Sequence, residues 1–175
     1  QYDIINTTKG NISGTAATFS QKLNVTGFST FSDTFISGIT TSSSHTYLHS
    51  YSEDVGTSSI NTGNGELTLD LSTGQNFEVT ISQAITKIIL TNAPSTSSSM
   101  TFSIKFTQSS GANYSVDIDD FEYNNSSVTV YWPGNVVPVV SQANGAVDIY
   151  SFKTFDTADL NNSGLYGIVG GQNFS

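Results

Sequence analysis

The densest group of acidic residues in the chain lies between positions 117 and 122: Asp117, Asp119, Asp120 and Glu122. Asp117 and Asp119 stand two residues apart in a segment that alternates like a strand, so their carboxylates are expected on one face. Such a pair could share a Ca²⁺ ion or act as the two acids of a glycosidase. No Gly-rich calcium loop follows, and acids on the outer face of a strand are commonly just solvated. We predict no metal site here and keep Asp117 and Asp119 as surface candidates for ligand binding.

Three aromatic residues follow the acidic group, Tyr123, Tyr131 and Trp132. Aromatic faces can stack on sugar rings, so together they could form a glycan platform. Trp132, however, is in phase with Val128 and Val130, which predicts an inward side chain and a core role. Tyr131 points to the opposite face. Tyr131 and Tyr123 are therefore the aromatic candidates for contact with a ligand.

The residue patterns typical of catalysis are missing. His45 and His49 are four residues apart, but Thr46 stands where a zinc-protease helix needs Glu, and the surroundings do not look helical. Three copies of one His could meet on a trimer axis and hold a metal, although simple packing is the expectation that we prefer. Serine is abundant, yet no Gly-x-Ser-x-Gly motif and no His occur in the C-terminal part. We predict a protein that binds rather than catalyses, without a cofactor.

The charge composition narrows the class of partner. The chain of 175 residues has 5 Lys and Arg against 14 Asp and Glu, a net charge of −9, and it contains no Cys. Without a basic cluster, nucleic acids and anionic membrane surfaces are poor partners. The apolar runs are only a few residues long, so we expect no membrane insertion.

The second half of the chain is patterned as β-strands. Alternating apolar and polar residues, bounded by turn residues, predict strands over 66–72, 76–82, 86–91, 100–107, 114–119, 128–132, 147–155 and 165–169. The short Gly-containing turn after the first of these predicts a hairpin with the second. The alternation slips near Ile149 and Tyr150, which indicates a bulge or a strand covered on both faces. The sequence predicts an all-β fold, an antiparallel, jelly-roll-like β-sandwich.

The first 38 residues contain an approximate repeat. Thr18-Phe19-Ser20 leads to Val25-Thr26-Gly27, and Thr30-Phe31-Ser32 leads to Ile36-Ser37-Gly38. A unit this short cannot bury its own apolar residues, so it needs stacked neighbours or partner chains. We read it as a stalk.

These repeats resemble the collar and shaft repeats of tailed-phage fibres and related virion appendages. Segments of the second half, such as Val130-Tyr131-Trp132-Pro133-Gly134, look like C-terminal modules of structural proteins from phages of marine bacteria. The resemblance implies a homotrimer on the virion surface, with other virion proteins as partners and a host-surface glycan as a possible receptor. The resemblance is more specific about the structural role of the protein than about its ligand.

The resulting hypothesis is a trimeric viral structural protein serving assembly and host attachment. Its expected parts are a β-repeat stalk at 1–38, a neck at 39–61 and a β-sandwich head at 62–175. Two alternatives stay open: a glycan-binding module, and a spike enzyme that depolymerises glycans with acids such as Asp117 and Asp119.

Overall fold

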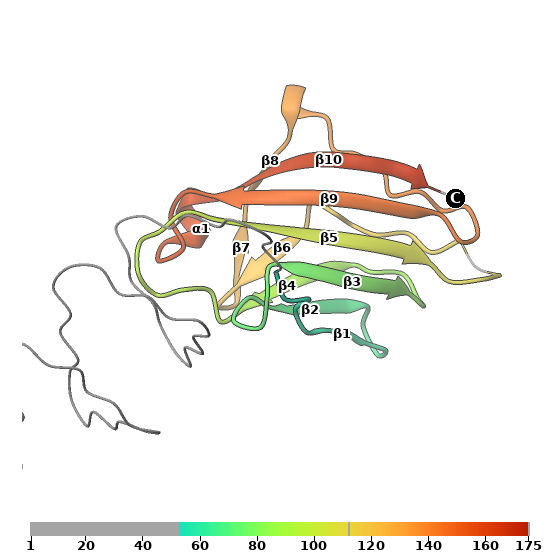
Figure 1. Ribbon diagram of the computed structural model, residues 1–175, viewed down its shortest axis with the longest axis horizontal. Coiled ribbons are helices and arrows are strands. Elements are labelled where there is room, and N and C mark those ends of the chain that lie inside the picture. The colour runs from blue at the N-terminus through green and yellow to red at the C-terminus, as the bar shows by residue number, and fades with distance from the viewer. Residues whose placement is uncertain (1–52, 112, 175) are drawn as a thin grey trace, which may run out of the picture. The chain divides into compact units, whose positions relative to one another are not determined.

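The computed structural model describes residues 53–111 and 113–174, in which nearly all the regular secondary structure is β-strand (Figure 1). The strands form two five-stranded sheets, one of which curls into a half-barrel. The first sheet has the order β1-β2-β4-β6-β7 and the second the order β3-β5-β9-β10-β8. The strands of the first sheet are β1 (Ser58–Asn61), β2 (Glu66–Asp70), β4 (Lys87–Thr91), β6 (Phe121–Tyr123) and β7 (Ser126–Val128). Those of the second are β3 (Asn76–Ile81), β5 (Met100–Gln108), β9 (Val147–Thr154), β10 (Leu165–Phe174) and β8 (Val130–Tyr131).

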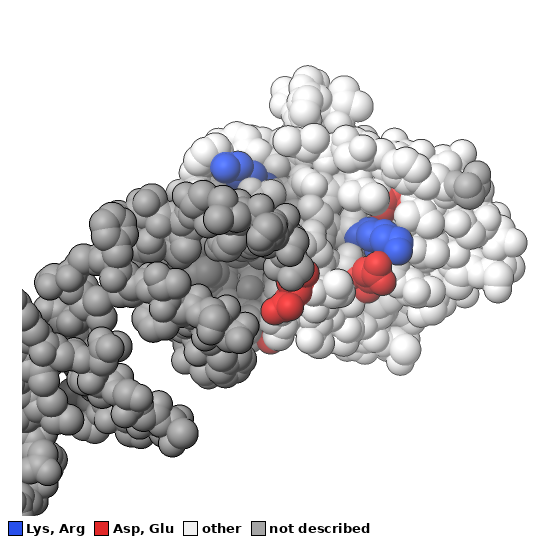
Figure 2. Space-filling view, viewed as in Figure 1, with Lys and Arg blue, Asp and Glu red and all other residues white. Residues whose placement is uncertain are grey.

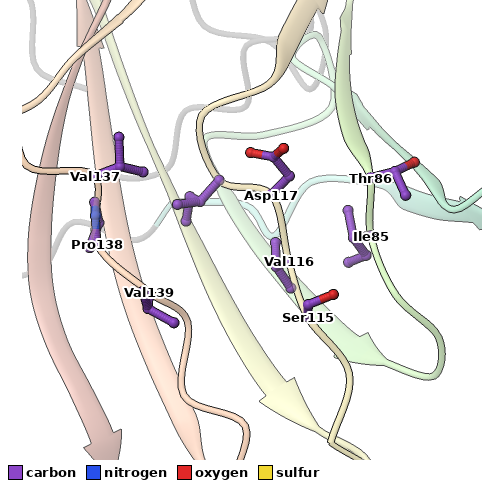
Figure 3. Close-up of a pocket in the computed structure, with 9 residues that line it drawn as sticks. Ile85, Thr86, Ser115, Val116, Asp117, Val137, Pro138 and Val139 are labelled. Atoms are coloured by element: carbon purple, nitrogen blue, oxygen red, sulfur yellow. The ribbon is translucent and has the colours of Figure 1, made fainter.

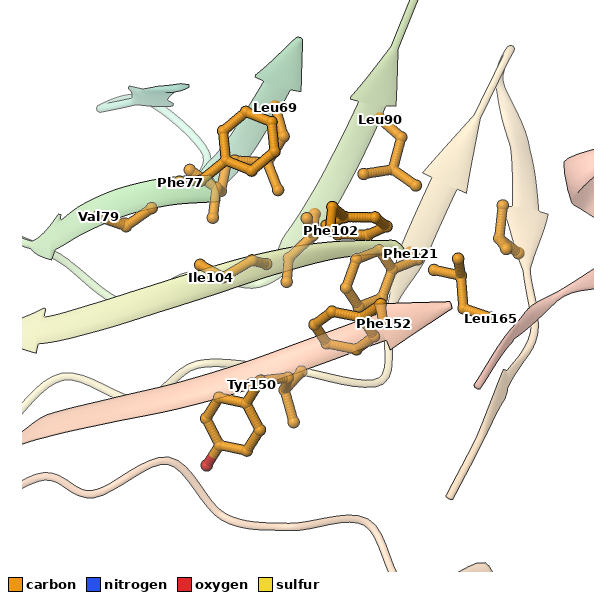
Figure 4. Packing of buried hydrophobic residues seen from close by; sticks show 14 of the residues in the cluster. Leu69, Phe77, Val79, Leu90, Phe102, Ile104, Phe121, Tyr150, Phe152 and Leu165 are labelled. Atoms are coloured by element: carbon orange, nitrogen blue, oxygen red, sulfur yellow. The ribbon is translucent and has the colours of Figure 1, made fainter. Parts of the chain in front are cut away.

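The core lies between the sheets and follows the alternation in the sequence. In β5 every second residue is buried, from Met100 through Phe102 and Ile104 to Phe106. Phe102 stacks on Phe152 of β9, with ring centroids 5.3 Å apart, and Phe121 of β6 approaches the same ring at 4.9 Å (Figure 4). Trp132 is buried as predicted. Aromatic side chains from both sheets therefore form the centre of the core.

The strand pairing is mixed, so the prediction of an antiparallel sandwich is wrong in this respect. β2, β4 and β6 run parallel to one another in the first sheet, and β3 runs parallel to β5 in the second. Consecutive strands from β2 to β6 alternate between the two sheets, so every second strand points the same way. The predicted hairpin of 66–72 with 76–82 is absent for the same reason, because β2 and β3 belong to different sheets.

The chain changes sheet at two further places. The bridge of Val55 with Asn76 extends the second sheet beyond β3, and after Thr57 the chain enters the first sheet as β1. At the other side, β7 leaves the first sheet and β8 joins the second, with Thr129 between them accepting a hydrogen bond from the Leu165 amide at 2.9 Å. Ser58–Asn61, within the expected neck, thus pairs with β2 as part of the sandwich.

Two local predictions are also corrected. Residues 114–119 form no strand; Val116 makes one isolated bridge with Ile85, and a loop follows. The irregularity predicted near Ile149 lies in the neighbouring strand, since β10 shifts register between Val169 and Gly171 while β9 alternates regularly.

The predicted stalk at 1–38, the repeats and both histidines lie outside the described residues. Among the residues that the structure does describe, no helix is long and apolar enough to cross a membrane. In the described part of the chain, the short helix α1 (Leu160–Ser163) connects β9 to β10.

Candidate functional site

An exposed aromatic cluster lies where β8, β9 and β10 meet. Tyr131 of β8 stacks on Tyr166 of β10, with ring centroids 5.2 Å apart and planes 30° apart. Phe155, directly after β9, meets the edge of Tyr166 at 5.6 Å, and Nζ of Lys153 lies 5.1 Å from the Phe155 ring. Tyr131 is 46% exposed and Phe155 62%. The cluster therefore presents ring surface and one cation to the outside.

Tyr131 and Tyr166 come together because β8 pairs with β10 in parallel register, Tyr131 opposite Tyr166. Gly164 stands just before β10 with a positive φ of 67°, and a Cβ there would lie 2.7 Å from the Tyr131 ring. Glycine is therefore required at this position for two reasons: it adopts the positive φ without strain, and it has no Cβ that would clash with the Tyr131 ring. The sequence did not identify Tyr166 or Phe155, because nothing local shows that β8 and β10 are neighbours.

Apolar side chains continue from this cluster along the outer surface of β9 and β10. Ile168 and Phe174 of β10 are 57% and 49% exposed, and Ile149 of β9 is half-buried beside them. Phe174 is paired with Val147, and its ring lies over Gly171. We call this strip, from Tyr131 and Tyr166 through Ile168 to Ile149 and Phe174, the outer β9–β10 face.

The outer β9–β10 face carries no outward-pointing acid. Asp148, the sole carboxylate in β8, β9 and β10, is turned inward and buried. Figure 2 shows a largely uncharged surface over β9 and β10. Lys105 of β5 and Glu78 of β3 form an exposed ion pair at 3.0 Å. In a chain with a net charge of −9, this surface stands out by its lack of negative charge.

The acidic group at 117–120 lies in the loop before β6. Asp119 accepts a hydrogen bond of 2.8 Å from the indole Nε1–H of Trp132, and Asp117 Oδ1 accepts the Asp119 backbone N–H at 3.2 Å. Asp119 thus has a structural partner in the core, while Asp117 is exposed. No group of three or more acidic, His or Cys side chains in the described part of the chain is placed to hold a metal ion.

The other aromatic candidate, Tyr123, lies apart from Tyr131. It ends β6 in the first sheet and packs, partly buried, against the core, whereas Tyr131 belongs to the second sheet. The three-membered platform of Tyr123, Tyr131 and Trp132 is therefore not formed. Tyr131 has Tyr166 and Phe155 as its aromatic neighbours instead.

A buried carboxylate fixes the far end of β10. Asp148, 1% exposed, accepts the backbone N–H of Ser141 (2.6 Å) on Oδ2 and that of Asn173 (2.7 Å) on Oδ1. Burial alone would raise the pKa of Asp148, but these two amides together with hydrogen bonds from the side chains of Ser141 and Gln172 hold the pKa below its usual range. Burial, and then the Asp148 charge, raise the pKa of Tyr150, whose hydroxyl donates to the same carboxylate at 3.3 Å.

An open groove of about 500 Å³ lies between two extended segments, 115–118 and 137–139 (Figure 3). Ile85 and Thr86 complete its lining. Asp117 also lines an adjoining smaller pocket of about 290 Å³, together with Asp119 and Asp120. The groove is thus mainly apolar and has an acidic end.

Comparison of the chain with models of protein families, with curated proteins and with solved structures found no match.

Proposed function

We propose that the chain is a structural protein of a virion appendage that assembles as a homotrimer and serves attachment to a host surface. One structural observation supports the assembly part of this proposal most directly: the apolar, acid-free outer β9–β10 face. Exposed apolar patches that are continuous over several side chains commonly mark sites of protein association. The short N-terminal repeats, which need partner chains to bury their apolar residues, support the same reading.

The occupant of this face that fits best is another copy of the same chain. Each copy has a net charge of −9, so copies repel one another wherever acids face each other. The outer β9–β10 face avoids this cost, because the outward residues of β9 and β10 carry no charge apart from Lys153. The number three comes from the resemblance to phage fibre repeats.

The mass of the full chain in solution tests the assembly. Light scattering should give about three times the chain mass of 18.6 kDa. Ile168→Asp should lower the mass towards that of one chain, since Ile168 is mostly exposed and the new charge meets the same charge in each neighbour. Val136→Asp is the matched control: Val136 is 70% exposed on a loop outside this face, so its variant should keep the wild-type mass.

Two results would overturn this assignment. A wild-type mass near 18.6 kDa would remove the homotrimer altogether. An Ile168→Asp variant with the full trimer mass would show that copies associate through another surface.

The aromatic cluster supports a second candidate function, glycan binding. Tyr131, Tyr166 and Phe155 offer ring faces of the kind that stack on sugar C–H groups, and Lys153 adds a donor for hydroxyl groups. Tyr131 and Tyr166 also belong to the outer β9–β10 face, so glycan binding by this cluster is an alternative to self-association through that end of the face. The glycan-depolymerising alternative would instead need Asp117 and a second acid across a sugar chain.

Titration with neutral oligosaccharides such as cellohexaose and chitohexaose, followed by tyrosine fluorescence, tests the cluster. Tyr131→Ala should weaken binding at least fivefold, whereas Tyr131→Phe keeps the stacked ring and should bind nearly as wild type. Asp117→Asn should leave binding intact, and release of shorter sugars that stops in Asp117→Asn would favour the enzyme instead. No saturable binding of any oligosaccharide would count against this second function.

A further inference from the structure

We propose that the groove between residues 115–118 and 137–139 accepts an extended segment of another polypeptide, which adds to the first sheet as a strand beside Val116. The partner would be a short run of alternating apolar residues with a Lys or Arg at one end. This inference is independent of the outer β9–β10 face, since the groove uses none of its residues.

The first argument is an unoccupied position in the sheet. Ser115 C=O accepts the Ile85 N–H at 2.9 Å, and Asp117 N–H donates to Ile85 C=O at 2.8 Å. In an extended chain, successive residues direct their amide groups to opposite sides. Val116 therefore directs its N–H and C=O away from Ile85, towards the groove, and no backbone group among the described residues pairs with them.

The reason for this gap is the path of the chain after β7. β7 is the neighbour of β6 in the first sheet, with Val128 opposite Phe121. Beyond Val128 the chain leaves this sheet and joins the second one as β8. Alongside Val116, where the next strand of the first sheet would run, there is consequently open space (Figure 3).

The second argument is the apolar surface at the opposite wall. Val137 and Val139 are 44% and 77% exposed, on either side of Pro138. This wall is held in place rather than loose, because the Val139 C=O accepts a hydrogen bond of 2.6 Å from Nε2 of Gln172. Alternate side chains of an added strand would pack against these valines. In other cases of strand addition, alternate side chains likewise enter pockets beside the open sheet edge.

The third argument is charge, which defines the chemistry of the partner. Asp117 lines the groove, and Asp119 and Asp120 line the pocket that adjoins it. No Lys or Arg lines either cavity. A cationic residue at one end of the partner strand would meet this acidic end, whereas an acidic residue there would be repelled.

The test uses the full ¹⁵N-labelled chain and two synthetic hexapeptides, Lys-Val-Thr-Val-Thr-Val and Glu-Val-Thr-Val-Thr-Val, both capped at their ends. We expect saturable shifts of groove amides with the Lys peptide, at least fivefold weaker binding of the Glu peptide, and at least tenfold slower hydrogen exchange of the Val116 amide in the complex. Exchange should slow in this way if the Val116 N–H gains a hydrogen-bond acceptor from the partner strand.

Two variants make the test sharper. Asp117→Lys should reverse the preference between the two peptides. Val116→Pro removes the N–H that the fold does not use and should abolish binding. If it fails to fold, Val139→Ser, at an exposed position, removes apolar surface without adding charge and should weaken binding of the Lys peptide instead. Absence of saturable shifts at millimolar peptide, unchanged exchange of the Val116 amide, or an unchanged preference in Asp117→Lys would each overturn the proposal.

Discussion

The indole Nε1–H of Trp132 donates a hydrogen bond of 2.8 Å to Oδ1 of Asp119, and this bond joins the end of β8 to the loop before β6. Trp132 is 6% exposed and meets Tyr150 and Phe152 edge-on. Its N–H has lost contact with bulk water, so it needs an acceptor inside the protein. Asp119 supplies that acceptor, which gives this acid a structural role.

Replacing Asp119 by Ala should therefore destabilise the fold. The buried indole N–H would lose its partner, at a cost of about 1–3 kcal/mol in the free energy of unfolding. Asp119→Asn keeps an oxygen acceptor and should restore much of the loss. Urea unfolding followed by Trp132 fluorescence measures both. Asp120→Asn is the matched control, and a loss of stability in the control as large as in Asp119→Ala would show that general loop charge, not this bond, is responsible.

Gly167→Ala should also destabilise the fold, lowering the free energy of unfolding by about 1–3 kcal/mol. A Cβ at this position would lie 2.5 Å from the Trp132 ring, which is too close for any normal contact. Trp132→Leu should relieve the clash, so the double variant should lose less than the sum of the two single variants. Gly63→Ala serves as the control because its Cβ would meet only Asn61 Oδ1 at 3.4 Å. Additive effects at Gly167 and Trp132 would contradict the contact.

The Asp148 carboxylate predicts a particular dependence of stability on pH. Its pKa in the folded chain is below the unfolded value of about 3.9, so folding favours the ionised form. The stabilisation is fully present above the unfolded pKa and is lost as the pH falls through the folded pKa. The melting temperature of the wild type should thus fall steeply below about pH 4.

Asp148→Asn should flatten this acid-side dependence and should lower stability at pH 7 by about 3 kcal/mol, because an amide cannot accept from Ser141 and Asn173 as a carboxylate does. Glu78→Gln, at an exposed ion pair, is the control and should leave the curve nearly unchanged. If the melting temperatures of the wild type and of Asp148→Asn fall equally with decreasing pH, other carboxylates are responsible for the loss of stability in acid.

Self-association through the outer β9–β10 face should tighten with salt. Apolar contacts are not weakened by screening, whereas the repulsion between copies of net charge −9 is. We expect the fraction of trimer, measured by sedimentation velocity, to rise between about 20 mM and 300 mM NaCl as the Debye length shortens. A fraction that falls with salt would indicate association through ion pairs, for instance with Lys105 or Lys153.

Local patterns in the sequence were sufficient to predict most strands and their inward residues. β5 and β9 show why: a strand with one buried face must alternate, so Phe102, Phe106 and Phe152 are recognisable from spacing alone. The inward position of Trp132 and the outward position of Tyr131 follow from the same rule. These predictions depend only on neighbours within one strand.

The pairing of strands could not be predicted in this way. A hairpin and a crossing between sheets need the same alternation and a similar short loop, and 72–75 is compatible with both. In the structure Gly74 lies against a segment 20 positions earlier, where a Cβ would be 2.5 Å from the Asp54 carbonyl oxygen, and no local pattern in 72–75 reveals that contact. The aromatic cluster was missed for the same reason, since Tyr131 and Tyr166 meet only through distant pairing.

The alternation of strands between the sheets also has a consequence for the time course of folding. β4 gains β6 as a neighbour only once Phe121 has been made, and β5 gains β9 only from Val147 onward, so both pairings close large loops before they gain contacts. Near the end of β10, Gln172 donates a hydrogen bond to the Val139 C=O, and the Asn173 N–H donates one to Asp148. During synthesis the growing chain would therefore keep these strand edges unpaired until the later strands have left the ribosome.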